Sequence, residues 1–221
     1  MFDKPVAKWK GGRYGNNPWF SYSPRLKRNV DFYSDLEYDN WVLIEMDPTI
    51  KTFTEQAHRV QEWVNGEYID TIFDMWCVPE IGKGYFSEVK YEYELEPSHP
   101  KYSERSAEQV AKQQMWCDYR GFEYIVRTDK IIRQNKLLLS NYKQMLPYVD
   151  DRVIPVETDR HRLIDYLQGT SPTTLGHLDE IYKDIPKHRI RSALFNLIHK
   201  GKVAASLEES RICSGLEVWL T

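Results

Sequence analysis

The sequence predicts a mixed α/β fold over residues 31–150, followed by a smaller domain of helices and a two-stranded ribbon over residues 151–221. Three observations indicate this. β-prone runs flank Asn65-Gly66, a dipeptide typical of tight hairpins. Segments with helical periodicity precede and follow those runs. The composition then changes near Asp150, and three further helix candidates follow that point.

The first domain opens with a helix expected over 31–46, in which Ser34 and Glu37 have the spacing of a capping box. The elements expected after it are strands at 50–56, 60–64, 67–78 and 85–93, a helix at 103–119, a strand at 122–127 and a helix at 133–146. The predicted buried stripe of the second helix is Ala107, Val110, Ala111 and Gln114, and Gly121 suits its end. Helix, antiparallel strands, helix and strand make a mixed α/β core.

The second domain is predicted to hold helices at 160–167, 175–182 and 186–199, then short strands at 203–207 and 216–220. This is the order of a winged helix-turn-helix. Its third helix would read a DNA groove, and it carries Lys187, Arg189 and Arg191. Acids on the preceding helix, and the use of winged helices as protein-docking modules, leave DNA contact and partner docking both open.

Composition narrows the class of protein. The 221 residues are 41% apolar and 14% aromatic, enough for a real core. The three cysteines are scattered without metal-ligand spacing, which favours a reducing cytoplasm. No apolar stretch is long enough to span a bilayer, so we expect a cytoplasmic protein with no membrane partner. A Gly-rich phosphate loop is absent from the sequence, which excludes ATP hydrolysis by such a loop.

The net charge of −3 conceals an uneven distribution. Residues 1–30 form a predicted basic and aromatic arm that suits a phosphate backbone, because cations displace condensed counterions. The alternative is a terminus with ordinary solvated charges. The candidate DNA-binding residues of the arm are Lys8, Lys10, Arg13, Arg25, Lys27 and Arg28.

A candidate catalytic site lies among the strand-forming residues. Glu88 and Lys90 are two apart on one expected strand, so their side chains point to the same face. If the hairpin before them is centred near Ile81, Asp74 comes opposite Glu88. Glu37, on a helical stripe with apolar residues, is the candidate fourth member; alternatively it only closes the capping box.

These residue types suit metal-dependent phosphodiester hydrolysis. Carboxylates of Glu37, Asp74 and Glu88 are hard ligands for one or two Mg²⁺ ions, for which Mn²⁺ would substitute. The metal would activate water and neutralise charge on the phosphate. Lys90 would orient or deprotonate the water, or stabilise the transition state. A solvated strand face is the plain alternative for Glu-x-Lys.

The ordered set of motifs resembles the PD-(D/E)xK restriction-endonuclease-like core and, within it, TnsA, the endonuclease subunit of heteromeric transposases. The resemblance covers residues 28–146. It rests on Ser34-Asp35-Leu36-Glu37, Thr54-Glu55-Gln56, Phe73-Asp74, Glu88-Val89-Lys90, Trp116, Phe122 to Arg127 and Thr128-Asp129-Lys130-Ile131.

The resemblance implies a function on double-stranded DNA. TnsA-like proteins cut the non-transferred strands at the 5′ ends of a transposon. A TnsB-like integrase-type transposase cuts and joins the 3′ ends, and a TnsC-like AAA+ regulator contacts the pair. The family's acids fall on Glu37 and Asp74 and its lysine on Lys90, whereas the position of Glu88 is often Gln. The competing hypotheses are a stand-alone restriction or repair nuclease and a non-catalytic DNA-binding adaptor.

Overall fold

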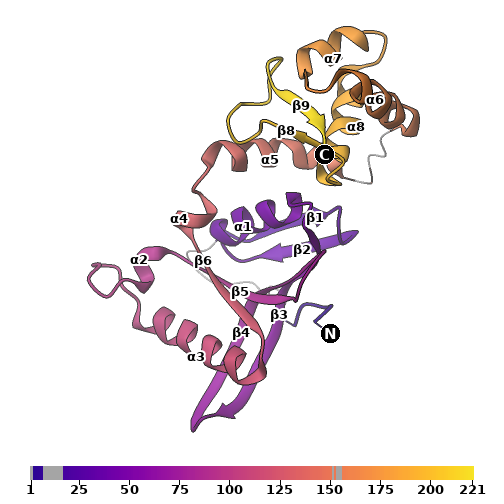
Figure 1. Cartoon of the computed structure of the whole chain (residues 1–221). Helices are drawn as coiled ribbons and strands as arrows, with labels where there is room; N and C mark the ends of the chain where they lie inside the picture. The colour runs from indigo at the N-terminus through magenta and orange to yellow at the C-terminus, as the bar shows by residue number, and fades with distance from the viewer. Residues whose placement is uncertain (1, 7–16, 151, 153–155) are drawn as a thin grey trace. The chain divides into compact units, whose positions relative to one another are not determined.

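The computed structural model describes residues 2–6, 17–150, 152 and 156–221 (Figure 1). The chain divides into two compact units. The first comprises Met1–Ile44 and Thr49–Gln134, and the second comprises Glu45–Pro48 and Asn135–Thr221. The main division therefore falls after Gln134, whereas the sequence suggested one near residue 150.

The first unit begins with an antiparallel hairpin of β1 (Trp19–Ser23) and β2 (Arg28–Phe32), followed by helix α1 (Asp35–Met46). The helix was expected from Asp31. The structure instead buries Val30 and Phe32 as alternate residues of a strand, and such period-two burial is the mark of β structure.

A four-stranded mixed sheet forms the centre of the first unit, as the predicted fold class requires. Its strands are β3 (Ile50–Val64), β4 (Glu67–Pro79), β5 (Tyr85–Lys90) and β6 (Glu123–Thr128), in the order β3-β4-β5-β6. The first three are mutually antiparallel, and β6 runs parallel to β5. The crossover between β5 and β6 contains helices α2 (Glu92–Leu95) and α3 (Glu104–Arg120), and α4 (Asp129–Ile132) follows β6.

The predicted hairpin at Asn65-Gly66 is confirmed, with φ values of 50° and 85°. Positive φ at both central residues is what a type I′ turn demands, and glycine adopts it without strain. The two strands expected at 50–56 and 60–64 are one strand. A register shift between Glu55 and His58, with Gln56 at φ 44°, interrupts its regular alternation.

Helices cover both faces of the sheet. Phe73 and Phe86 pack against Trp116 of α3 on one face. Val89 packs with Leu36 of α1 and with Ile132. Because successive residues of a strand point to opposite faces, Glu88 and Lys90 share the α3 face with Phe86.

The buried stripe of α3 differs from the predicted one. The helix buries Gln113, Trp116 and Cys117, while Ala111 and Gln114 are exposed. Large aromatic and sulfur-containing side chains bury more apolar area than alanine, so they set which face turns inward. The expected end of the helix is confirmed, because Gly121 adopts φ 74° and its N–H donates to carbonyls of the last turn.

The second unit begins with helix α5 (Lys136–Val149), which continues through Pro147. It continues with α6 (Glu157–Thr170), β7 (Thr173–Thr174), α7 (Leu175–Ile181), α8 (Lys187–His199), β8 (Val203–Ala205) and β9 (Glu217–Leu220). The strands form an antiparallel sheet in the order β7-β9-β8. The three helices and two strands expected after residue 150 are therefore present.

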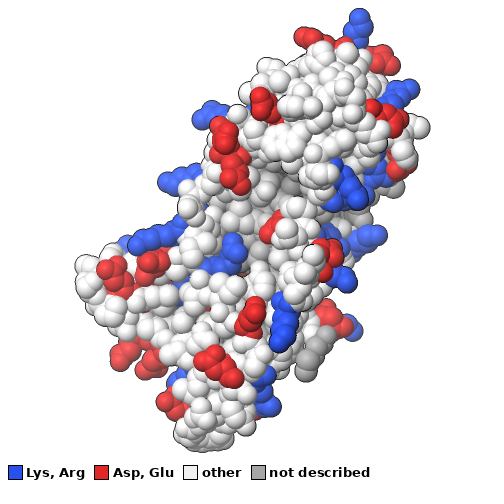
Figure 2. All heavy atoms as spheres, in the orientation of Figure 1, with Lys and Arg blue, Asp and Glu red and all other residues white. Residues whose placement is uncertain are grey.

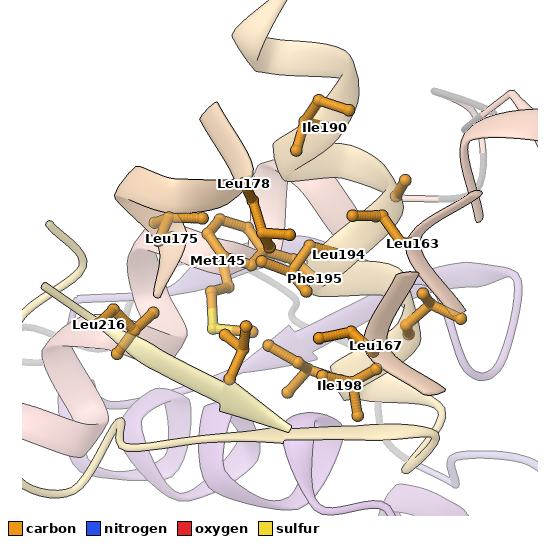
Figure 3. Packing of buried hydrophobic residues seen from close by; sticks show 14 of the residues in the cluster. Met145, Leu163, Leu167, Leu175, Leu178, Ile190, Leu194, Phe195, Ile198 and Leu216 are labelled. Atoms are coloured by element: carbon orange, nitrogen blue, oxygen red, sulfur yellow. The ribbon is translucent and has the colours of Figure 1, made fainter. Parts of the chain in front are cut away.

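The core of this unit is apolar and shared by its helices and sheet. Leu163 and Leu167 of α6, Leu194 of α8 and Leu216 before β9 are each 0% exposed and pack in one cluster (Figure 3). The segment 45–48 joins this unit because Met46 lies in the same cluster.

Across the described part of the chain, no helix has the length and apolar character needed to cross a membrane.

Candidate functional site

Asp74 and Glu88 meet where strands β4 and β5 separate. The antiparallel pairing runs Cys77 to Tyr85 and Met75 to Ser87, and one further step in this register sets Asp74 opposite Glu88. The backbone N–H of Asp74 donates to a Glu88 carboxylate oxygen at 3.4 Å. The N–H of Val89 donates to the Asp74 carboxylate at 2.8 Å. The predicted juxtaposition of the two acids is present.

Glu88 is fully buried, and nitrogen donors meet both of its carboxylate oxygens. Lys90 Nζ lies 2.6 Å and Gln109 Nε2 lies 2.8 Å from Oε1. Gln113 Nε2 lies 3.0 Å from Oε2, which also receives the Asp74 N–H. A carboxylate can accept about four hydrogen bonds, so this one is saturated.

Glu37 closes the capping box that its spacing predicts. Its backbone N–H donates to Ser34 Oγ at 3.1 Å, and its carboxylate accepts from Ser34 Oγ at 3.1 Å and from the N–H of Tyr33 at 3.2 Å. The capping-box interpretation of this residue is confirmed. Glu37 also lies near enough to Asp74 and Glu88 for their charges to raise its pKa.

The site is crowded with negative charge. Burial, with the neighbouring charge of Asp74, raises the pKa of Glu37 to about 8 and that of Glu88 to about 7. Burial also raises the pKa of Asp74, against the opposing effects of Lys90 and the Val89 N–H. Burial opposes charging of Lys90, but Glu88 and Asp74 outweigh it, and the pKa of the ammonium is raised. The charges of Glu88 and Asp74 therefore act on the Lys90 ammonium, which pairs directly with Glu88.

The donor set suits a hard divalent cation in part. Among the described residues, no three His, Cys, Asp or Glu side chains are arranged to hold a metal ion as they stand. Asp74 Oδ1 has a long contact of 3.5 Å with Gln56 Nε2, so it retains accepting capacity. Asp74 and Glu37 therefore fit as oxygen ligands, and a cation would relieve their mutual repulsion. Glu88 fits less well, because its lone pairs already accept hydrogen bonds.

The candidate DNA-binding residues of the N-terminal arm lie either outside the described residues or at the hairpin of β1 and β2. Lys8, Lys10 and Arg13 lie outside the described residues. Arg25 donates to the carbonyl of Ile50, and Lys27 lies in the turn between β1 and β2. Arg28 forms a two-pronged ion pair with Glu55, at 2.5 and 2.7 Å, in which the Glu55 carboxylate is buried.

The cations of helix α8 are also engaged within the protein. Arg189 pairs with Asp159 of α6, with N···O distances of 3.0 and 3.1 Å. Arg191 pairs with Asp179 of α7 at 2.6 and 2.8 Å, and Lys187 lies 3.6 Å from the same carboxylate. Figure 2 shows Lys and Arg side chains interspersed with Asp and Glu on the face in view.

Sequence reasoning missed Gln109, Gln113 and Tyr124 of the site, and it included Gln56 only as part of the motif Thr54-Glu55-Gln56. Gln109 and Gln113 are four residues apart and so project from the same side of α3. The available signal was the spacing of Gln113 from Trp116 and Cys117, which marks it as part of the buried stripe. Glutamine is usually exposed, so its presence there is informative.

No protein-family model matches this chain, and a search of the curated proteins found no match.

Proposed function

We propose that the protein is a metal-dependent DNA endonuclease of the TnsA type, which cleaves the 5′ ends of a transposon as one subunit of a heteromeric transposase. The observation that carries the proposal is the convergence of Asp74, Glu88 and Lys90 at the point where β4 and β5 part. Two acids and a lysine in this arrangement suit hydrolysis of a phosphodiester to a 3′-hydroxyl and a 5′-phosphate.

The side chains have distinct roles in this proposal. Asp74 and Glu37 would hold Mg²⁺ or Mn²⁺, and Glu88 was expected to join them. The bound metal supplies Lewis acidity and an activated water. Lys90, paired at 2.6 Å with Glu88, presents a fixed positive charge that stabilises charge developing on the phosphate.

The fold supports this proposal without being specific to it. The first unit has a helix, an antiparallel hairpin, a further helix and a parallel strand, as a restriction-endonuclease-like core would. In the second unit, the order of α6, α7 and α8 before β8 and β9 supports a winged helix. Because Arg189 and Arg191 are held by acids, docking to a protein partner suits α8 better than reading a DNA groove.

The proposed partners follow from the function. They are the double-stranded transposon ends, a TnsB-like integrase-type transposase and a TnsC-like AAA+ regulator. The proposed location is the cytoplasm, where cysteines that form no disulfide, as here, are the rule.

The decisive experiment is 5′-end cleavage in a mixture reconstituted with the partner transposase and Mg²⁺. Asp74→Asn keeps an oxygen that can accept the Val89 N–H but lacks the negative charge that strengthens binding of a divalent cation. We expect this variant to fold and to lose cleavage. Unchanged cleavage by folded Asp74→Asn would overturn the proposal. Cleavage of plasmid DNA by this chain alone would instead favour the stand-alone nuclease.

A non-catalytic adaptor is the second candidate, and the saturation of Glu88 by nitrogen donors favours it. Calorimetry with Mn²⁺ separates the two. Heat of binding that disappears in Asp74→Asn supports the nuclease, and absence of metal binding in the intact protein supports the adaptor.

A further inference from the structure

Gln113 is a buried polar residue whose whole amide group is used. It is 0% exposed in the middle of α3. Its Nε2 lies 3.0 Å from Thr71 Oγ1, 3.3 Å from the carbonyl of Ile72 and 3.0 Å from Glu88 Oε2. Its Oε1 lies 2.6 Å from the hydroxyl of Tyr124. An apolar side chain would fill the same place without desolvation of an amide, so this network needs a reason.

The orientation of the Gln113 amide is fixed by what surrounds it. Thr71 and Tyr124 carry hydroxyls that can donate or accept, but the carbonyl of Ile72 can only accept. The NH₂ group must therefore face Ile72 and Glu88, and the amide oxygen must face Tyr124. With this orientation, Gln113 can only donate to Glu88.

Gln109 completes the arrangement one turn earlier on α3. Its Nε2 donates to Glu88 Oε1 at 2.8 Å, beside Lys90 Nζ at 2.6 Å. The Glu88 carboxylate thus accepts hydrogen bonds from two residues of α3 and from the Asp74 N–H. The remaining contact of this carboxylate is the one to Lys90, so these hydrogen bonds determine where the Lys90 ammonium is held.

We propose that Gln113 and Gln109 are positioning residues that hold Glu88 as a clamp for Lys90, and that Glu88 acts through this clamp rather than as a metal ligand. The inference rests on the proposed endonuclease site. It assigns α3 a part in the reaction, through two glutamines that touch neither metal nor DNA in this proposal.

The test compares Gln113→Leu with Gln114→Leu in the full-length protein. Gln114 is the matched control, because it is exposed on the same helix and contacts Asp118 within that helix. In the reconstituted cleavage mixture, we expect Gln113→Leu to lower the single-turnover rate by about 10- to 100-fold. The DNA concentration that gives half-maximal rate and the Mn²⁺ affinity should stay unchanged, and Gln114→Leu should behave as the unmodified protein.

Two further variants test the contacts of Glu88 independently of Gln113. Gln109→Ala removes the partly exposed glutamine of the pair, and it should also lower the single-turnover rate. This variant provides the test if Gln113→Leu does not fold. Glu88→Gln should retain Mn²⁺ affinity in calorimetry, whereas Asp74→Asn should lose it. An unaltered rate in folded Gln113→Leu or Gln109→Ala overturns the clamp, as does loss of Mn²⁺ binding in Glu88→Gln.

A labelling readout separates failure of the clamp from failure of the function. The Lys90 side chain is 13% exposed, and that of Lys130 is 69% exposed. In reductive methylation followed by mass spectrometry, Lys90 should react more slowly than Lys130 in the unmodified protein, and it should react measurably faster in Gln113→Leu. If Lys90 reacts faster in Gln113→Leu but no Asp74-dependent cleavage is found, the clamp is supported and the nuclease proposal is overturned. Protection of Lys90 that persists in Gln113→Leu rejects the clamp.

Discussion

The backbone N–H of Val89 donates to the side-chain carboxylate of Asp74 at 2.8 Å. This bond stands just beyond the last paired residues of β4 and β5, where a sheet would otherwise leave the N–H without a strand partner. Asp74 therefore has a structural task besides any chemical one. The side chain holds the two strands together at the place where they begin to separate.

The first prediction concerns that bond. Asp74→Asn keeps an acceptor for the Val89 N–H and should stay within about 1 kcal/mol of the unmodified protein in urea unfolding. Asp74→Ala removes the acceptor and should lose about 1–3 kcal/mol. Asp70→Ala, at an exposed site of the same strand, serves as the control. Equal losses in the two Asp74 variants would show that the charge, and not the bond, matters.

The second prediction concerns pH. The pKa of Glu37 is raised to about 8 in the folded protein, chiefly by burial, so the folded state holds a proton that the unfolded state releases near the ordinary value of 4.5. Stability from this group is fully present below pH 4.5 and is lost as pH rises through about 8. The loss between pH 5 and pH 8 should be on the order of 3 kcal/mol in EDTA.

The measurement is the difference between the unmodified protein and Glu37→Gln across that range, since Gln cannot titrate. Subtraction is needed because burial lowers the pKa of His58, which acts in the opposite direction. An equally steep decline in Glu37→Gln would assign the effect to other groups.

The third prediction tests the core of the second unit. Leu194→Ala removes a side chain that is 0% exposed and should lower the stability of that unit by about 3 kcal/mol through lost burial and the cavity left behind. Ile181→Ala, at a position 45% exposed on α7, should change it by less than about 0.5 kcal/mol. Thermal unfolding of both variants provides the comparison. Similar midpoints would contradict the packing of Leu194.

The fourth prediction contrasts two ion pairs of Arg. Arg28→Ala leaves the buried Glu55 carboxylate without its partner and should destabilise the first unit by about 2 kcal/mol. Arg59→Ala breaks an exposed pair with Asp70 and should lose about 0–1 kcal/mol. Chemical denaturation measures both. Equal losses of stability in the two variants would mean that the burial of Glu55 does not strengthen its ion pair with Arg28.

The parts of the fold that follow from local chemistry could be predicted from the sequence. The dipeptide Asn65-Gly66 predicted the hairpin between β3 and β4. A turn centred on Ile81 predicted that Asp74 lies opposite Glu88, since both are seven residues from it. The bulge at Gln56 could not be predicted, because a non-glycine residue with positive φ leaves no local signal.

The supporting residues of the site were hidden for a different reason. Gln113 lies 25 residues from Glu88 in the chain, and their contact depends on how α3 packs across the sheet. The sequence likewise does not indicate which carboxylate a given lysine or arginine will pair with, because the two residues can be far apart in the chain. The ion pairs of Arg28, Arg189 and Arg191 appear only when the helices and strands are assembled.

Residues 45–48 belong to the second unit although they are flanked by segments of the first. A fragment that ends at Gln134 would therefore retain the last turn of α1 without the residues of the second unit that this turn contacts. Met46 would lose the apolar cluster that buries it, and Glu45 would lose the contact of its carbonyl with His199 at 2.9 Å. Limited proteolysis after Gln134 should accordingly yield a first fragment whose helix α1 frays towards Glu37.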